Sequence, residues 1–247
     1  MSSLHGDGKR DTLGSTLLPH VRAAFSARRN GARPMDGNRV MKILCVSDQV
    51  VSNIYSSQMR ERFGDVDLVL SCGDLPYYYM EFIVSLLNVP CLYVHGNHDQ
   101  PEHKSDGRVL HEPGGWINVD RQTIECKGLL IGGLEGCLRY KPGVPYQYSD
   151  LGMHYRTWQM IPGLLLNRAR YGRFVDILIT HAPPFGIHDG PDLPHRGFGV
   201  FTHFMDRFQP RYLLHGHKHI YGHETRKTTY NQTQVINVHP FHLLEWD

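Results

Sequence analysis

Continuous apolar runs of strand length alternate with helix-like segments in the first half of the chain. The runs at 41–47, 66–73 and 91–96 are typical of strands in a sheet that is covered on both faces. Between them, residues 55–63 and 77–88 have helical character. This βαβαβ order predicts parallel strands joined by right-handed crossovers.

The pattern changes in the middle of the chain. Segments 116–120, 122–128 and 129–136 are shorter apolar stretches joined by turn-forming residues, which predicts an antiparallel meander. A longer helical pattern covers 150–171. We expect the Pro162-Gly163 pair to break this helix, because proline lacks the backbone N–H that a helix interior needs.

Strand patterns return in the last third of the chain. Residues 175–180 and 211–216 are predicted to be strands, with a short helix near 199–208 between them. The segment TQVINV (233–238) is predicted to be the strand that closes the chain. The whole pattern favours the α/β class, with two sheets carrying helices on their outer faces.

Composition is that of a soluble globular protein with a sizeable core: 247 residues, 40% apolar and 20% charged. The formal net charge is +2, but residues 1–40 carry seven Lys/Arg against three Asp, or +4, which leaves the remainder at −2. This balance gives no strong field, so neither a nucleic-acid nor a membrane partner is expected.

The basic N-terminal segment is expected to lie outside the fold. Residues 1–40 are interpreted as a disordered tail, or as the result of a start codon placed too early, since Met35 and Met41 follow within the chain. An Arg- and Ser-containing organelle transit peptide is the alternative. Residues 41–247 are predicted to form one domain.

Five cysteines without CxxC spacing, three of them in or beside apolar runs, suggest buried free thiols in a reducing compartment. No stretch of 18 or more apolar residues occurs, so no membrane span is expected. A cytoplasmic location is the resulting prediction.

Metal-competent side chains follow five of the predicted strands, at the point where each strand ends. Ligands collect at the carboxyl ends of strands in α/β sheets, so these groups should converge in space. Each of them alone has an ordinary structural interpretation as a turn, cap or loop residue. The set is Asp48, then Asp74, then Asn97, His98 and Asp99, then His181, and last His217 and His219.

These residue types suit hard or borderline divalent cations. Carboxylate, imidazole and amide oxygen favour Mn, Fe, Zn or a similar ion, and the absence of cysteine among them disfavours a structural zinc. His217 and His219 are two apart in an extended segment, so both can face one pocket. A carboxylate such as Asp74 can bridge two cations roughly 3.5–4 Å apart.

In order and placement, these motifs resemble the calcineurin-like metallophosphoesterase family over roughly residues 41–240. The combination of GNHD (96–99) with a distant GHKH (216–219) is the specific feature. Segments 72–90, 180–198 and 210–219 look like a bacterial sub-branch of the family that lacks the first-motif histidine. The resemblance implies a four-layer α/β/β/α sandwich, with two mixed sheets flanked by helices.

The resemblance also implies a role for each motif residue. Asp48 and His219 would hold the first metal, and Asp74 would bridge. The second metal would be held by Asn97, His181 and His217. Outside the ligand set, His98 would act as general acid near the leaving group, with Asp99 orienting it.

The chain departs from the family at its first motif. The pattern is normally D-x-H, and here it is Asp48-Gln49-Val50. Valine cannot ligate a cation, which leaves three hypotheses: a weak first metal completed by water or substrate, a replacement ligand, or a one-metal site. Glu81 is a candidate replacement, behind the tyrosines at 77–79.

The resemblance implies a metal-dependent hydrolase of phosphoric esters, either a phosphodiesterase or a phosphomonoesterase, acting on a small phosphoester. His195 and Arg196 are candidate substrate-binding residues, since Arg196 could pair with a phosphate; a structural loop role is the alternative. The rival function is a metal- and phosphate-binding pseudoenzyme with an incomplete first metal site. A nuclease is a third option, but the −2 balance of residues 41–247 lacks the basic footprint of a nucleic-acid groove.

Overall fold

Two mixed sheets dominate the computed structural model, which describes residues 40–222 and 224–247; the predictions for residues 1–39 lie outside this range. The first sheet has five strands in the order β15-β1-β2-β3-β6. Its centre is parallel, as the apolar runs predict, because β1, β2, β3 and β6 all run the same way. The strands are β1 (Met41–Val46), β2 (Leu68–Ser71), β3 (Cys91–Tyr93), β6 (Ile117–Asn118) and β15 (Phe241–Trp246).

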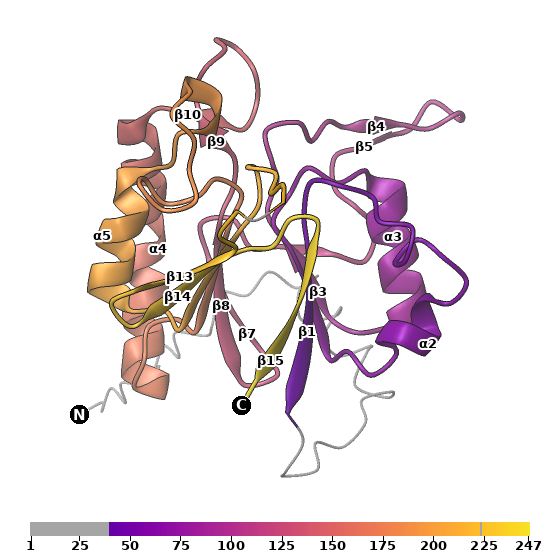
Figure 1. The fold of residues 1–247 in the computed structure, drawn as a ribbon, viewed down its shortest axis with the longest axis horizontal. Helices are drawn as coiled ribbons and strands as arrows, with labels where there is room; N and C mark the ends of the chain where they lie inside the picture. The colour runs from indigo at the N-terminus through magenta and orange to yellow at the C-terminus, as the bar shows by residue number, and fades with distance from the viewer. Residues whose placement is uncertain (1–39, 223) are drawn as a thin grey trace, which may run out of the picture. The chain divides into compact units, whose positions relative to one another are not determined.

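Helices α2 (Met59–Phe63) and α3 (Tyr77–Leu87) pack on the outer face of this sheet (Figure 1). Helix α2 is shorter than the predicted 55–63, since residues 55–58 form turns. Helix α3 begins after Pro76, whose fixed φ suits an N-terminus, and ends at Asn88 in the left-handed conformation. The apolar faces of both helices cover β1–β3 through one buried cluster.

The second sheet has six strands in the order β13-β14-β12-β11-β8-β7. Its four inner strands are parallel, and β13 and β7 add antiparallel edges. The strands are β7 (Thr123–Cys126), β8 (Leu129–Leu134), β11 (Ile177–Thr180), β12 (Tyr212–His215), β13 (Lys227–Tyr230) and β14 (Thr233–Asn237).

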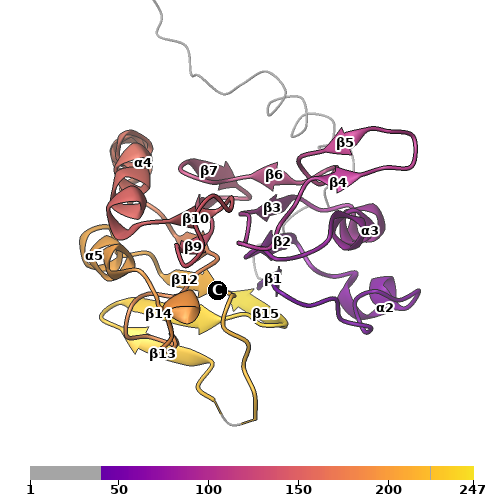
Figure 2. The same cartoon turned by 90° about the horizontal axis from the view of Figure 1, so that it is seen from above.

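Helices α4 (Asp150–Tyr171) and α5 (Gly199–Phe208) cover the outer face of the second sheet. Figures 1 and 2 show the four layers in order: α2 and α3, the five-stranded sheet, the six-stranded sheet, then α4 and α5. The α/β/β/α sandwich is therefore confirmed. The described residues form one compact unit.

The prediction that Pro162-Gly163 breaks the long helix is wrong, because α4 continues from Asp150 to Tyr171. Pro162 is on the exposed side of α4. The carbonyl of Trp158, which loses its usual N–H partner to proline, therefore lies on the side where water can satisfy it. Ser149 caps the helix start by accepting a hydrogen bond from the Gly152 N–H at 3.1 Å.

Two further predictions need correction. The middle of the chain is not a simple meander: only β7 and β8 pair antiparallel, while the preceding strand β6 joins the other sheet beside β3. The chain does not close with 233–238 either, since β15 follows and pairs antiparallel with β1. Its alternation of buried and exposed positions is weak, which hides it from a search for apolar runs.

Short elements complete the described chain. β4 (Glu102–His103) pairs with β5 (Val109–Leu110), and β9 (Cys137–Leu138) pairs with β10 (Gln147–Tyr148). A 3₁₀ turn covers Leu193–His195. All five cysteines are free and buried, as expected. Among the described helices, none is both long and apolar enough to cross a membrane.

Candidate metal centre

The strand-end residues converge because the parallel strands of both sheets present their carboxyl ends at one edge of the sandwich. Asp48 follows β1, Asp74 follows β2, and Asn97 follows β3 in the first sheet. His181 and His217 follow β11 and β12 in the second. A side chain joins these loops across the two sheets, since the Asp48 carboxylate accepts from the backbone N–H of His217 at 3.0 and 3.1 Å.

The loops hold unusual backbone conformations. Asp48, Asp74 and His217 have φ of 65°, 57° and 67°, in the left-handed region that non-glycine residues rarely adopt. Such residues cost on the order of 1–3 kcal/mol each and cluster at functional sites. Glycine is required beside them, because a Cβ on Gly96 would collide with the Asp74 carboxylate and a Cβ on Gly216 with Ser47 and Asp48.

Four donor atoms surround one point between the sheets. His181 Nε2 lies 2.9 Å from Asn97 Oδ1, 3.1 Å from His217 Nδ1 and 3.3 Å from Asp74 Oδ2. One ligand atom from each of Asp74, His181 and His217 falls within 4.8 Å of the others. His181 is fully buried and His217 nearly so.

Outer contacts fix which ring nitrogen of each histidine carries hydrogen. His181 Nδ1 lies 2.7 Å from the Cys72 carbonyl, and His217 Nε2 lies 2.6 Å from the Pro194 carbonyl. A carbonyl only accepts, so these nitrogens are the donors, which leaves lone pairs on His181 Nε2 and His217 Nδ1. In two neutral rings these lone pairs would repel across 3.1 Å, and either a proton on His181 Nε2 or a shared cation removes this repulsion.

The amide of Asn97 is oriented in the same sense. Its Nδ2 donates to the Tyr140 hydroxyl at 3.2 Å, which turns Oδ1 toward His181. Two imidazole nitrogens, an amide oxygen and a carboxylate oxygen are a donor set for a borderline divalent cation. The arrangement therefore fits a metal ion in chemistry as well as in geometry.

The charge state without a cation fits this interpretation. Burial lowers the pKa of His181, but the Asp74 and Asp48 carboxylates outweigh burial and raise it to about 9. Burial raises the pKa of Asp74, but His181 and the His98 N–H lower it to about 2. Burial and His181 together lower the pKa of His217 to about 3. A proton on His181 thus occupies the place that a cation would take.

Comparison with known proteins agrees with this geometry. The family model for the calcineurin-like phosphoesterases matches residues 41–221. The chain belongs to the calcineurin-like phosphoesterase family. It is also 22% identical over 229 residues to the UPF0046 protein K07C11.7 of Caenorhabditis elegans, a match that covers 85% of this chain and 74% of the other.

A solved structure supports the fold of this chain. TT1561 of Thermus thermophilus superposes with a TM-score of 0.53 at 15% identity, over 81% of this chain and 89% of the other. At this identity the likeness shows the fold alone.

The residues expected to hold a first metal are less closely gathered in this chain. Burial and the neighbouring Asp74 raise the pKa of Asp48 overall, although His181 and His219 partly offset this rise. His219 is exposed; its ring stacks on His239 at 4.3 Å between centroids, and its Nδ1 lies 3.2 Å from the Tyr221 hydroxyl. Asp48 and His219 are both outside the three-residue ligand group found among the described residues.

Val50 packs against the apolar cluster between β1–β3 and helices α2 and α3, together with Val51. The position of the family's first-motif histidine is thus taken by a partly buried apolar side chain that packs against the core. The candidate replacement Glu81 faces elsewhere: Oε1 accepts from the Gly114 N–H at 3.2 Å, and Oε2 lies 4.0 Å from Lys104 Nζ. These contacts give no support to Glu81 as a substitute ligand.

His98 and Asp99 occupy different environments. His98 is exposed, and its backbone N–H donates to Asp74 Oδ1 at 2.8 Å. The buried Asp99 carboxylate accepts from the N–H groups of Asp74, Leu75 and Gly96 at 2.8–3.3 Å. Burial and Asp74 raise the pKa of Asp99 to about 7. Asp99 therefore holds together the two loops that carry Asp74 and Asn97.

Of the two candidate substrate-binding residues, His195 lies beside the centre. The His195 ring lies 5.3 Å from that of His217, and its Nδ1 contacts Asp192 at 2.6 Å. Arg196 is exposed, with its guanidinium 5.0 Å from the centre of the Phe185 ring. Their roles toward a substrate stay predictions.

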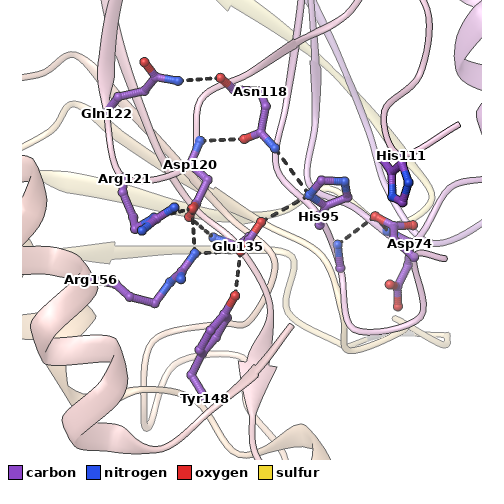
Figure 3. A network of polar contacts seen from close by, with 12 residues as sticks. Asp74, His95, His111, Asn118, Asp120, Arg121, Gln122, Glu135, Tyr148 and Arg156 are labelled. Carbon is purple, nitrogen blue, oxygen red and sulfur yellow. Dashed lines mark hydrogen bonds and ion pairs between the residues drawn. The ribbon is translucent and has the colours of Figure 1, made fainter. Parts of the chain in front are cut away.

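Sequence reasoning missed a buried charged network behind the centre (Figure 3). Glu135 lies 3.1 Å from His95 Nδ1, and it accepts from Tyr148 at 2.5 Å and from Arg156 at 2.6 Å. Arg156 also contacts Asp120 at 2.6 Å. His95 precedes the Gly96-Asn97 loop, so the network anchors a ligand-bearing segment. Glu135 follows strand β8, and that strand-end position is the signal that could have revealed it.

Proposed function

We propose that this chain is a metal-dependent phosphoester hydrolase whose main cation is held by Asp74, Asn97, His181 and His217. The proposal rests on one observation. The ring nitrogens His181 Nε2 and His217 Nδ1 lie close to one another and to oxygens of Asp74 and Asn97, so that all four atoms can share one cation. Their outer partners, Cys72, Pro194 and Tyr140, orient them for ligation. Family membership supports the reaction class.

A divalent cation at this centre supplies Lewis acidity and lowers the pKa of bound water toward neutrality. The protein's own residues do the rest. His98 is exposed at the rim with its backbone tied to Asp74, so its ring is free to donate a proton to the departing alkoxide. Arg196 follows His195, whose ring lies beside that of His217, and it offers a positive charge for a phosphate oxygen.

One observation favours a second candidate, a metal- and phosphate-binding protein without turnover. Val50 replaces a ligand, and both oxygens of Asp48 already accept from the His217 N–H. The exposed His98 beside the centre favours the enzyme, because a protein that only binds phosphate does not need a proton donor there.

Turnover of a generic phosphomonoester and a generic phosphodiester with added Mn²⁺ separates the two. We expect wild type to hydrolyse at least one of them, and His98→Ala to lower kcat by about 10²–10⁴-fold. His203→Ala is the matched control, since His203 is an exposed histidine on α5, and it should retain activity. Tight metal binding without turnover of either ester would establish the binding protein instead.

A further inference from the structure

Helix α4 carries an apolar stripe on the face that points away from the sheet. Leu151, Tyr155, Trp158 and Leu165 recur at spacings of four, three and seven residues, and they are 79%, 61%, 64% and 56% exposed. Pro162 falls on the same exposed face, and Leu166, 47% exposed, lies at its edge. We refer to this set as the α4 stripe. Figure 2 shows α4 on the outside of its layer, beside α5.

The stripe is separate from the part of α4 that builds the core. The opposite face buries Met153, Thr157, Met160, Leu164 and Asn167 against the second sheet. A surface helix normally places polar residues opposite its core face. Here both faces are apolar, which is typical of a helix that has neighbours on two sides.

The area of the stripe is that of an interface. From their exposed fractions, its leucine and aromatic side chains present roughly 600 Å² of surface. Monomers rarely expose contiguous apolar patches larger than a few hundred Å². A stable interface buries about 800 Å² on each partner, which the stripe and its immediate border can supply.

The spacing of the stripe matches a twofold axis. Leu151 and Leu165 lie seven residues on either side of Trp158. Two antiparallel copies of α4 crossing at Trp158 therefore place Leu151 of each copy against Leu165 of the other. Such a contact is isologous, because the same residues meet on both copies.

Charge favours the antiparallel direction. The first turn of α4 contains Asp150, and the last turn contains Arg168 and Arg170. Antiparallel pairing brings each acidic end toward the basic end of the other copy and opposes the helix dipoles. Parallel pairing would bring like charges together.

From these observations we propose that the chain forms a homodimer through antiparallel pairing of its α4 helices, with Trp158 on the twofold axis. The occupant of the α4 stripe is thus a second copy of the chain. This inference does not depend on the proposed hydrolase activity.

The oligomeric state of the full chain tests the proposal. Sedimentation over a wide concentration range should give a dimer for wild type and a monomer for Trp158→Glu. Val109→Glu is the matched control: Val109 is 41% exposed in the β4–β5 hairpin, so this variant should stay dimeric. The unfolding transition of Trp158→Glu, measured alongside, shows that the variant is folded.

Cysteine crosslinking tests the direction, since the five native cysteines are buried. Trp158→Cys should crosslink to itself. Leu151→Cys should crosslink when mixed with Leu165→Cys and not alone. A wild type that stays monomeric, self-crosslinking of Leu151→Cys alone, or a monomer that binds neutral lipid vesicles through Trp158 would each overturn the proposal.

Discussion

At the scale of single residues, the orientation of two histidine rings defines the candidate centre. His181 and His217 each give one ring nitrogen to a backbone carbonyl and turn the other toward Asp74 and Asn97. Sequence spacing predicts that these residues meet, but not which nitrogen faces the cation. That choice depends on the carbonyls of Cys72 and Pro194, which belong to other segments.

We propose that Val50 limits the number of cations that bind. We expect Val50→His, which restores the family's D-x-H pattern beside Asp48, to tighten binding of a second Mn²⁺. The variant should also lose on the order of 1–3 kcal/mol of unfolding free energy, because Val50 packs against the core. Titration with Mn²⁺ and chemical unfolding measure the two effects. A second-site affinity equal to that of wild type would contradict this view of Val50.

At the scale of elements, the loops and helices are tied together by charge. Arg156 of α4 is nearly buried and contacts both Asp120 and Glu135. Burial lowers the pKa of His95, but its hydrogen bond to Glu135 raises it overall. The cluster links α4 to the strand ends behind the metal centre (Figure 3).

Removing one member leaves buried charge without its partner. Arg156→Met should lower the free energy of unfolding by about 3–5 kcal/mol. Arg121→Ala is the control: Arg121 also contacts Asp120, but its side chain is 45% exposed, so its loss should change stability by about 1 kcal/mol or less. Urea unfolding of both variants measures the contrast. Equal losses of unfolding free energy in the two variants would mean that the buried Arg156 contributes no more to stability than the exposed Arg121.

Strand β15 makes the fold sensitive to acid. Burial, with Lys227 and Arg226, lowers the pKa of His242 from 6.5 to about 4. The unfolded chain therefore binds this proton first as the pH falls from about 6.5 to 4, and the unfolding free energy should decrease over that window. His242→Gln should show a smaller decrease, measured by unfolding at several pH values. If the unfolding free energy of His242→Gln decreased with pH as steeply as that of wild type, His242 would be excluded as a source of the acid sensitivity.

At the scale of the whole molecule, the sequence predicts most of the layers and the edge where the ligands gather. Parallel strands such as β1 and β2 can be predicted from the sequence, because strands that are covered on both faces are continuous apolar runs. Strand β15 cannot be predicted in this way, because it is a partly exposed edge strand and has no continuous apolar run. Pro162 misleads, since its effect on the helix depends on the side of α4 it occupies.

Most of the network around Glu135 was out of reach, because its members come from five separate segments and no spacing connects them; only Glu135, which follows strand β8, had a strand-end signal. The motif residues were accessible because each of them follows the end of a predicted strand. What the sequence leaves open, the strength of the first metal site, depends on side-chain packing at Val50 and on the exposure of His219.

The central claim is that Asp74, Asn97, His181 and His217 form one strong cation site beside a weak one. The most direct measurement is equilibrium binding of Mn²⁺ to the metal-free full chain, for wild type, His181→Ala and the control His203→Ala. We predict one tight equivalent per chain for wild type and for the control, a second equivalent only at much higher Mn²⁺, and loss of the tight equivalent in His181→Ala. Two equivalents of equal affinity, or tight binding that survives in His181→Ala, would contradict the account.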